Sequence, residues 1–170
     1  MMQIETERLF LIPLTARDLH SMMHNKQQAA CELGWISDGK ELDSKMRFIY
    51  QLKAQNIGKD QANWLFCTYF AIVLKESKHL VGQIGFKGTP DENGEIEVGY
   101  GLEDEKWYGK GFATEALKAL IRWAFAQQGV LCVVADTDKS NFASQKVLKK
   151  SGMLFWKEEF DYFWWKIKKA

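Results

Sequence analysis

The chain of 170 residues has the length of one ordinary domain. Its composition is 46% hydrophobic and 26% charged, and 23 lysines and arginines against 22 aspartates and glutamates give a formal net charge of +1. This much apolar material forms a core without disulfides, and the small net charge excludes an intrinsically disordered chain. The charge balance also argues against a dedicated nucleic-acid-binding protein, which carries a basic excess. We therefore expect a single domain over residues 1–170 with no nucleic-acid partner.

The start of the chain and its cysteines indicate a cytoplasmic protein. Glu5, Glu7 and Arg8 stand where a secretory signal would need apolar residues. No apolar run approaches the ~20 residues that cross a bilayer, so we expect no membrane partner. The cysteines are odd in number and far apart, which favours buried free thiols over disulfides. They are Cys31, Cys67 and Cys132.

The first half of the chain predicts one strand and two helices. The strand covers residues 7–13, and Thr15 offers an N-cap for a helix over residues 16–25. Turn signals make residues 27–43 irregular. A second helix is expected over residues 44–55, with Gly58 as its stop.

The second half predicts a sheet that is antiparallel at first and then gains a parallel step. Short turns separate three strand-like runs, so these runs form an antiparallel meander over residues 65–75, 80–87 and 95–102. Next come a helix over residues 114–128, a strand at 130–135, a short helix at 141–152 and one or two last strands within 155–165. The fold class is therefore α/β (α+β): a mixed, mostly antiparallel central sheet flanked by helices.

Glycines and carboxylates share one face of the expected strand at residues 95–102. Side chains alternate along a strand, so the apolar residues from Ile96 to Leu102 take one face and Glu95, Glu97, Gly99 and Gly101 take the other. Two glycines in line leave a groove that a ligand can approach closely. The alternative is equally open at this point: the glycines mark a bulge or tight packing, and the glutamates are solvated.

The loop at residues 107–113 is a candidate anion site. Gly109 and Gly111 precede a long helix, whose first N–H groups and dipole favour a phosphate. No Walker A pattern is present. A Rossmann site is rejected because Thr114 replaces the third glycine and because six residues separate the strand from the loop.

Three segments together resemble the GNAT acyl-CoA-dependent N-acyltransferases, closest to the branch of ribosomal-protein N-terminal acetyltransferases. They are TERLFLIPLTARDL near the start, GKGFATEAL in the loop and helix, and NFASQKVLKKSGM downstream. The resemblance spans essentially the whole chain in the correct order. It implies a splayed strand–loop–helix site for acetyl-CoA, with no metal.

The resemblance also implies which residues hold the coenzyme. Its pyrophosphate would lie on the loop amides, and its pantetheine would pair like an extra strand with the splayed strand. A further pair of residues would line the far side. The loop residues are Tyr108, Gly109, Lys110, Gly111, Phe112, Ala113 and Thr114. The residues of the splayed strand are Tyr100, Gly101 and Leu102, and those on the far side are Asn141 and Ser144.

The implied reaction is direct attack of a primary amine on the thioester in a ternary complex. Glu97 is the expected general base, Glu95 is the reserve, and a backbone N–H near Leu102 would hold the oxyanion. The chain departs from the family at two positions. Tyr108 replaces a frequent Gln or Arg, and Leu148 replaces a tyrosine that acts as general acid, so the proton must come from elsewhere, from water, or not be needed.

If the acidic residues between positions 91 and 105 rim the acceptor entrance, they favour a cationic acceptor: a protein N-terminus, a polyamine or an aminoglycoside-like amine. The alternative for the outer acids, that they belong to a solvated hairpin tip, is equally open. The alternative function is a non-catalytic acyl-CoA-binding sensor or interaction module, which Leu148 supports and Glu97 opposes. We expect a monomer or a homodimer. His20 and His24 lack a third ligand, so no metal is expected.

Overall fold

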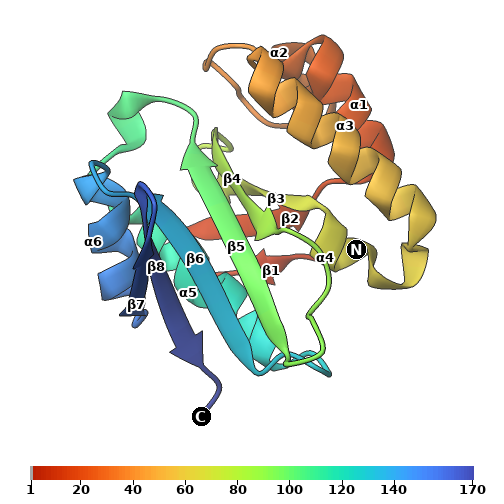
Figure 1. The fold of residues 1–170 in the computed structure, drawn as a ribbon. Coiled ribbons are helices and arrows are strands. Elements are labelled where there is room, and N and C mark those ends of the chain that lie inside the picture. Colours follow the sequence, from red (N-terminus) through yellow and green to blue (C-terminus); the bar gives the residue numbers. More distant parts are fainter. Residues whose placement is uncertain (1) are drawn as a thin grey trace.

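The computed structural model describes residues 2–170 and places one mixed sheet between two groups of helices (Figure 1). The first half of the chain contains β1 (Ile4–Glu5), β2 (Leu9–Pro13), α1 (Ala16–His24), α2 (Lys26–Glu32), α3 (Ser44–Lys59), the 3-10 turn η1 (Gln61–Asn63), α4 (Trp64–Cys67), β3 (Tyr69–Leu74) and β4 (Leu80–Phe86). The second half contains β5 (Glu95–Leu102), η2 (Glu105–Trp107), α5 (Phe112–Phe125), β6 (Cys132–Asp138), α6 (Phe142–Lys150), β7 (Leu154–Glu159) and β8 (Tyr162–Lys168).

The eight strands lie in the order β1-β2-β3-β4-β5-β6-β8-β7. Strands β3, β4 and β5 form the expected antiparallel meander. Helix α5 then crosses over and returns the chain as β6, which runs parallel to β5. The remaining neighbours, β1–β2, β2–β3, β6–β8 and β8–β7, are antiparallel. The expected fold class, with its single parallel step, is confirmed.

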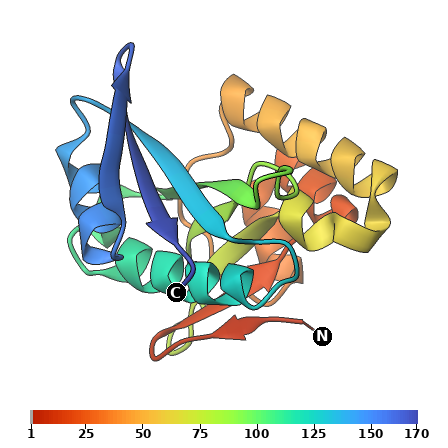
Figure 2. The same ribbon diagram turned by 60° about the horizontal axis from the view of Figure 1, so that its bottom comes forward.

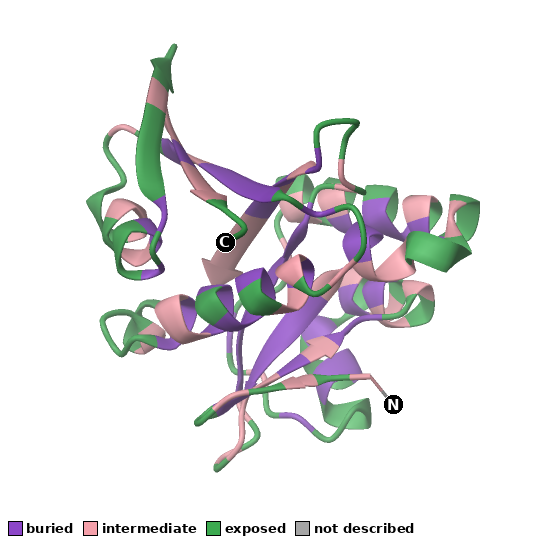
Figure 3. Ribbon diagram, turned by 90° about the horizontal axis from the view of Figure 1, so that it is seen from below, coloured by how far each residue is buried: buried purple, intermediate pink, exposed green. Residues whose placement is uncertain are grey.

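Each face of the sheet covers its own core. Helices α5 and α6 pack on one face, where Ile96, Val98 and Leu120 are buried together. Helices α1 to α3 pack on the other face with Ala71 and Val73 of β3. Figure 3 shows the outer side of α5 exposed and its inner side buried against the sheet. The β7–β8 hairpin projects beyond the helices (Figure 2), and Phe160 at its tip is 86% exposed.

Two segments differ from the expected elements. Residues 27–43 were expected to be irregular, but α2 occupies their start because the Asn25 side chain accepts a hydrogen bond from the Gln28 N–H and caps the helix. Residues 65–67 were expected in a strand but form α4, and the strand begins only at Tyr69. The intervening Thr68 donates its hydroxyl proton to the Leu14 carbonyl and is fully buried.

Smaller differences concern a helix end and a cysteine. Helix α3 continues through Gly58 to Lys59, because Gly58 is exposed and its neighbours Ala54 and Ile57 pack in the core. Cys31 was expected to be buried but is exposed on α2, whereas Cys67 and Cys132 are buried. Burial raises the pKa of both buried thiols. Across residues 2–170 there is no helix with the length and apolar character of a membrane span.

Candidate functional site

Strands β5 and β6 pair over a short stretch and then diverge. Their parallel register covers Glu95–Glu97 of β5 and ends at the pair Glu97–Val134. Both strands continue beyond this pair, β5 to Leu102 and β6 to Asp138. A wedge therefore opens between neighbouring strands in the middle of the sheet, with Glu97 at its apex (Figure 1).

The free side of β5 offers unpaired backbone groups to this wedge. The Glu97 carbonyl accepts from the N–H of Lys87, and the Glu103 N–H donates to the carbonyl of Val81, both toward β4. Backbone bonds in an antiparallel ladder alternate in direction along a strand. The residues between Glu97 and Glu103 that turn their N–H and C=O groups toward the wedge are therefore Val98, Tyr100 and Leu102.

The loop after β5 presents a second set of backbone donors. Gly109 and Gly111 have φ values of +71° and +83°, a conformation that residues with a side chain rarely adopt. Gly111 is the N-cap of α5 and supplies no side-chain acceptor, so the first N–H groups of the helix have no side-chain cap. Together with the helix dipole, these N–H groups favour an anionic ligand.

The free end of β5 and the loop line one cleft of about 530 Å³. Its walls come from the end of β5, the loop, the start of α5, and α6. The lining residues are Tyr100, Gly101, Leu102, Trp107, Tyr108, Gly109, Gly111, Phe112, Ala113, Thr114, Asn141, Ala143, Ser144, Lys146, Val147 and Lys150. All the residues expected to hold the coenzyme are among them, with the exception of Lys110.

Polar contacts across the cleft join β5 to α6. The hydroxyls of Tyr100 and Ser144 lie 2.8 Å apart. Burial raises the pKa of Tyr100 to about 12, against the opposing effect of Ser144, so the phenol stays protonated near neutral pH. Asn141 caps α6 by accepting from the Ser144 N–H at 3.1 Å. Trp107 lines the cleft wall, and its buried indole Nε1 has no hydrogen-bond partner within residues 2–170.

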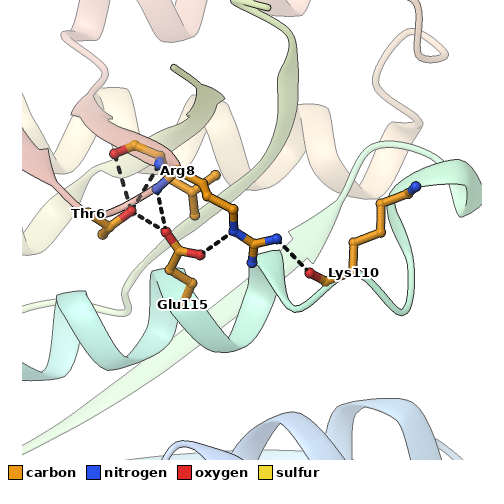
Figure 4. A network of polar contacts seen from close by, with 5 residues as sticks. Thr6, Arg8, Lys110 and Glu115 are labelled. Carbon is orange, nitrogen blue, oxygen red and sulfur yellow. Dashed lines mark hydrogen bonds and ion pairs between the residues drawn. The ribbon is translucent and has the colours of Figure 1, made fainter. Parts of the chain in front are cut away.

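A clasp formed by Thr6, Arg8 and Glu115 fixes the loop from outside the cleft (Figure 4). The Glu115 carboxylate accepts from the Thr6 hydroxyl at 2.6 Å and from the Arg8 backbone and Nε at 2.8 and 2.7 Å. The guanidinium also donates to the Lys110 carbonyl at 2.9 Å. Burial acts to raise the pKa of Glu115, but the hydrogen bonds from Thr6 and Arg8 outweigh it and lower the pKa. Arg8 thus holds the backbone of Lys110, while the Lys110 side chain points away from the clasp (Figure 4).

Glu95 and Glu97 lie on the other side of β5, outside the lining of the cleft. Glu97 pairs with Lys87 at 2.5 Å, and the same lysine lies 4.0 Å from Asp136 of β6. Glu95 pairs with Lys166 of β8 at 3.0 Å. Both carboxylates are partly exposed, at 25% for Glu97 and 28% for Glu95. The two carboxylates and the residues expected to hold the coenzyme therefore lie on opposite faces of β5. Glu97 is the last β5 residue paired with β6, so it lies at the closed end of the wedge.

Local sequence patterns pointed to the strand and the loop but missed three parts of the site. The clasp joins residues more than a hundred positions apart, so no local spacing predicts it. Trp107 reads as an ordinary aromatic residue, and only the folded chain places it in the cleft wall. Lys150 enters the cleft because α6 packs beside α5. Among residues 2–170, no group of three or more histidine, cysteine, aspartate or glutamate side chains is arranged to hold a metal ion.

Comparisons with known proteins agree with this geometry. The model of the acetyltransferase (GNAT) domain matches residues 8–154. An uncharacterized N-acetyltransferase, YjdG of Bacillus subtilis (strain 168), is 31% identical over 170 residues and 97% of each chain. The structure of the ribosomal-protein-S5-alanine acetyltransferase of Vibrio fischeri superposes with a TM-score of 0.72 at 18% identity, over 99% of this chain and 97% of its own.

A second solved structure, of a RimL ribosomal alpha-N-protein acetyltransferase in complex with coenzyme A, gives a TM-score of 0.70 at 16% identity over 98% of both chains. Likeness at these identities establishes the fold. The family match extends over most of the sequence, and the similarity to YjdG runs the full length. This chain therefore belongs to the GNAT acetyltransferase family.

Proposed function

We propose that the protein transfers the acetyl group of acetyl-CoA to a primary amine, either a protein N-terminus or a small cationic amine, in a ternary complex. The main support is the wedge: the free backbone of Tyr100 and Leu102 stands in one cleft with the uncapped start of α5. Pantetheine carries amides that match such a strand edge, and pyrophosphate matches the helix start. The residues present thus fit the coenzyme.

When bound, acetyl-CoA supplies an activated acyl group as a thioester. In this proposal Glu97 takes the proton that an ammonium acceptor must lose before it attacks, because its backbone lies at the apex of the wedge and its side chain on the face opposite the cleft. The Leu102 N–H, directed into the wedge, would stabilise the oxyanion. Leu148, at the family position of an acid, is fully buried and takes no part in the site.

The acceptor would approach from the face that carries Glu95, Glu97 and Asp136. These carboxylates alternate with Lys87 and Lys166, with which they form ion pairs. A cationic amine can exchange with one of these lysines as a partner for Glu97. The names of the two ribosomal-protein acetyltransferase neighbours support a peptide N-terminus as one acceptor class.

The first test compares binding and turnover. Acetyl-CoA and CoA, but not NADH, should raise the midpoint of thermal unfolding in a concentration-dependent way. A panel of N-terminal peptides, polyamines and aminoglycosides, assayed by release of the CoA thiol, then identifies the acceptor. Binding of acetyl-CoA without turnover of any amine would favour the sensor function instead.

The second test concerns the base. Glu97→Gln should lower kcat by roughly 10²–10⁴-fold, because the acceptor then lacks a group to take its proton. Glu95→Gln is the matched control, since Glu95 lies two residues away on the same face and also pairs with a lysine; its kcat should stay near that of the wild type. An unchanged kcat for Glu97→Gln at saturating substrates would exclude Glu97 as the base.

A further inference from the structure

Lys87 bridges the two strands that form the wedge. It directly follows β4, and its backbone N–H donates to the Glu97 carbonyl at 2.9 Å, which fixes the residue beside β5. Its ammonium lies 2.5 Å from the Glu97 carboxylate of β5 and 4.0 Å from the Asp136 carboxylate of β6. Asp136 lies two residues beyond Val134, the last β6 residue paired with β5. The ammonium is therefore placed where the two strands begin to separate.

The side chain of Lys87 has room to move. It is 52% exposed. Gly99 of β5 lies beside it without a side chain, and a Cβ at Gly99 would meet only the Lys87 Cε, at 3.6 Å. A lysine has a flexible aliphatic stem, so the nitrogen can turn from Glu97 toward the gap between the strands. Lys87 is thus a primary amine on a flexible arm next to the proposed base.

Lys87 occupies the position that the proposed function gives to the acceptor. An acceptor must lose a proton to Glu97 and reach a thioester held in the wedge, and the Lys87 ammonium contacts Glu97 at the start of that wedge. Lys166 on the same face provides the contrast. It pairs with Glu95 at 3.0 Å, but Glu95 is still paired with Cys132 of β6, so the strands leave no gap at that point.

We propose that the protein acetylates its own Lys87 when no outside amine is present. The inference rests on the proposed function for the base and for the place of the thioester. The Lys87 ammonium gives a proton to Glu97, and its nitrogen bonds to the acetyl carbonyl carbon as the carbon–sulfur bond breaks. The sulfur keeps the electron pair of that bond and takes up a proton, so the products are an acetylated Lys87 and CoA. The modification removes the charge that competes with a cationic acceptor for Glu97.

The test is incubation of the purified protein with acetyl-CoA alone, followed by peptide mapping with mass spectrometry. Lys87 should be acetylated at least about tenfold faster than Lys106, an exposed lysine that is also in an ion pair, with Asp38. Glu97→Gln should lower the rate at Lys87 by roughly 10²-fold or more and leave the rate at Lys106 unchanged. The rate constant at Lys87 should not depend on the protein concentration, because the amine and the base belong to one chain.

Two matched variants and a binding measurement serve as controls. Over the same time the intact mass of the wild type and of Lys166→Arg should rise by one acetyl group, and that of Lys87→Arg should not. Lys87→Arg keeps the positive charge beside Glu97 but lacks the nucleophilic amine. Calorimetric titration with CoA should give Lys87→Arg and Glu97→Gln the affinity of the wild type. A loss of affinity that explains the slower acetylation of Glu97→Gln would overturn the inference.

The possible outcomes separate this inference from the proposed function. Acetylation of Lys87 no faster than that of Lys106, or a rate that rises with protein concentration, would overturn self-acetylation while turnover of an outside amine still supported the transfer. Acetylation of Lys87 that depends on Glu97, with no outside amine acetylated, would support the inference and overturn the proposed acceptor classes. Failure to bind acetyl-CoA would overturn both.

Discussion

Gly109 and Gly111 share a left-handed backbone but differ in their surroundings. A Cβ at Gly109 would meet open space, whereas a Cβ at Gly111 would lie 3.3 Å from the Arg8 guanidinium. Gly109→Ala should therefore cost roughly 1–2 kcal/mol of conformational strain and little else. Gly111→Ala should add to this cost a displacement of Arg8 from the Lys110 carbonyl, and so weaken CoA binding further.

The measurement is titration of both variants with CoA, together with urea unfolding. We expect Gly111→Ala to lose more affinity than Gly109→Ala at a comparable loss of stability. Equal losses of affinity would show that the clasp has no part in shaping the loop, and that the left-handed backbone is the whole requirement at both positions.

Helix α2 is joined to the end of β5 by an ion pair between Lys26 and Glu103, whose side chains are both 5% exposed. Lys26→Met should destabilise the fold by about 3–5 kcal/mol, because it leaves a buried carboxylate without a counter-charge. The double variant Lys26→Met/Glu103→Leu should be more stable than Lys26→Met alone, since it removes both charges together. Urea unfolding of Lys26→Met, Glu103→Leu and the double variant measures the coupling energy between the two side chains. A loss of stability in the double variant equal to the sum of the two single losses would contradict the predicted coupling.

The helices and strands differ in how far the sequence predicts them. The meander and α5 follow from periodicity and turns within short windows, and the strand and loop of the site lie inside those windows. The last strand region was expected as one or two strands within 155–165 and forms two, β7 and β8. Helix α2 was missed because its cap, Asn25, coincides with the end of α1 and because Glu41, which binds the Lys26 N–H, lies fifteen residues away. The Arg8–Glu115 clasp depends on tertiary packing, and no short-range pattern predicts it.

The whole molecule should unfold as one unit, because β3 and β4 contribute side chains to the cores on both faces of the sheet. Lys53 of α3 links the two layers by donating to the Phe86 carbonyl at 2.8 Å. Burial lowers the pKa of Lys53 to about 8. The unfolded chain, whose lysines titrate near pH 10.5, therefore binds more protons than the native protein between about pH 8 and 10.5.

The free energy of unfolding should therefore rise with pH between about 8 and 10.5 because of Lys53. Below that window Lys53 is protonated in both states, so it gives the free energy of unfolding no pH dependence. Lys53→Met should lack this contribution. Unfolding monitored by tryptophan fluorescence and by far-UV circular dichroism should coincide at each pH. A wild-type profile parallel to that of Lys53→Met across the window would show that the buried amine is not desolvated as the structure implies.

The short pairing of β5 with β6 divides the sheet into two plates joined over three residue positions. One plate carries β1 to β5, and the other carries β6, β8 and β7. A small rotation at such a hinge is amplified along the free arms, so the mouth of the wedge widens far more than its apex. We expect large coenzymes to enter and leave by this motion. Glu97 lies at the pivot itself, the point that moves least, so the proposed base can keep its position throughout the cycle.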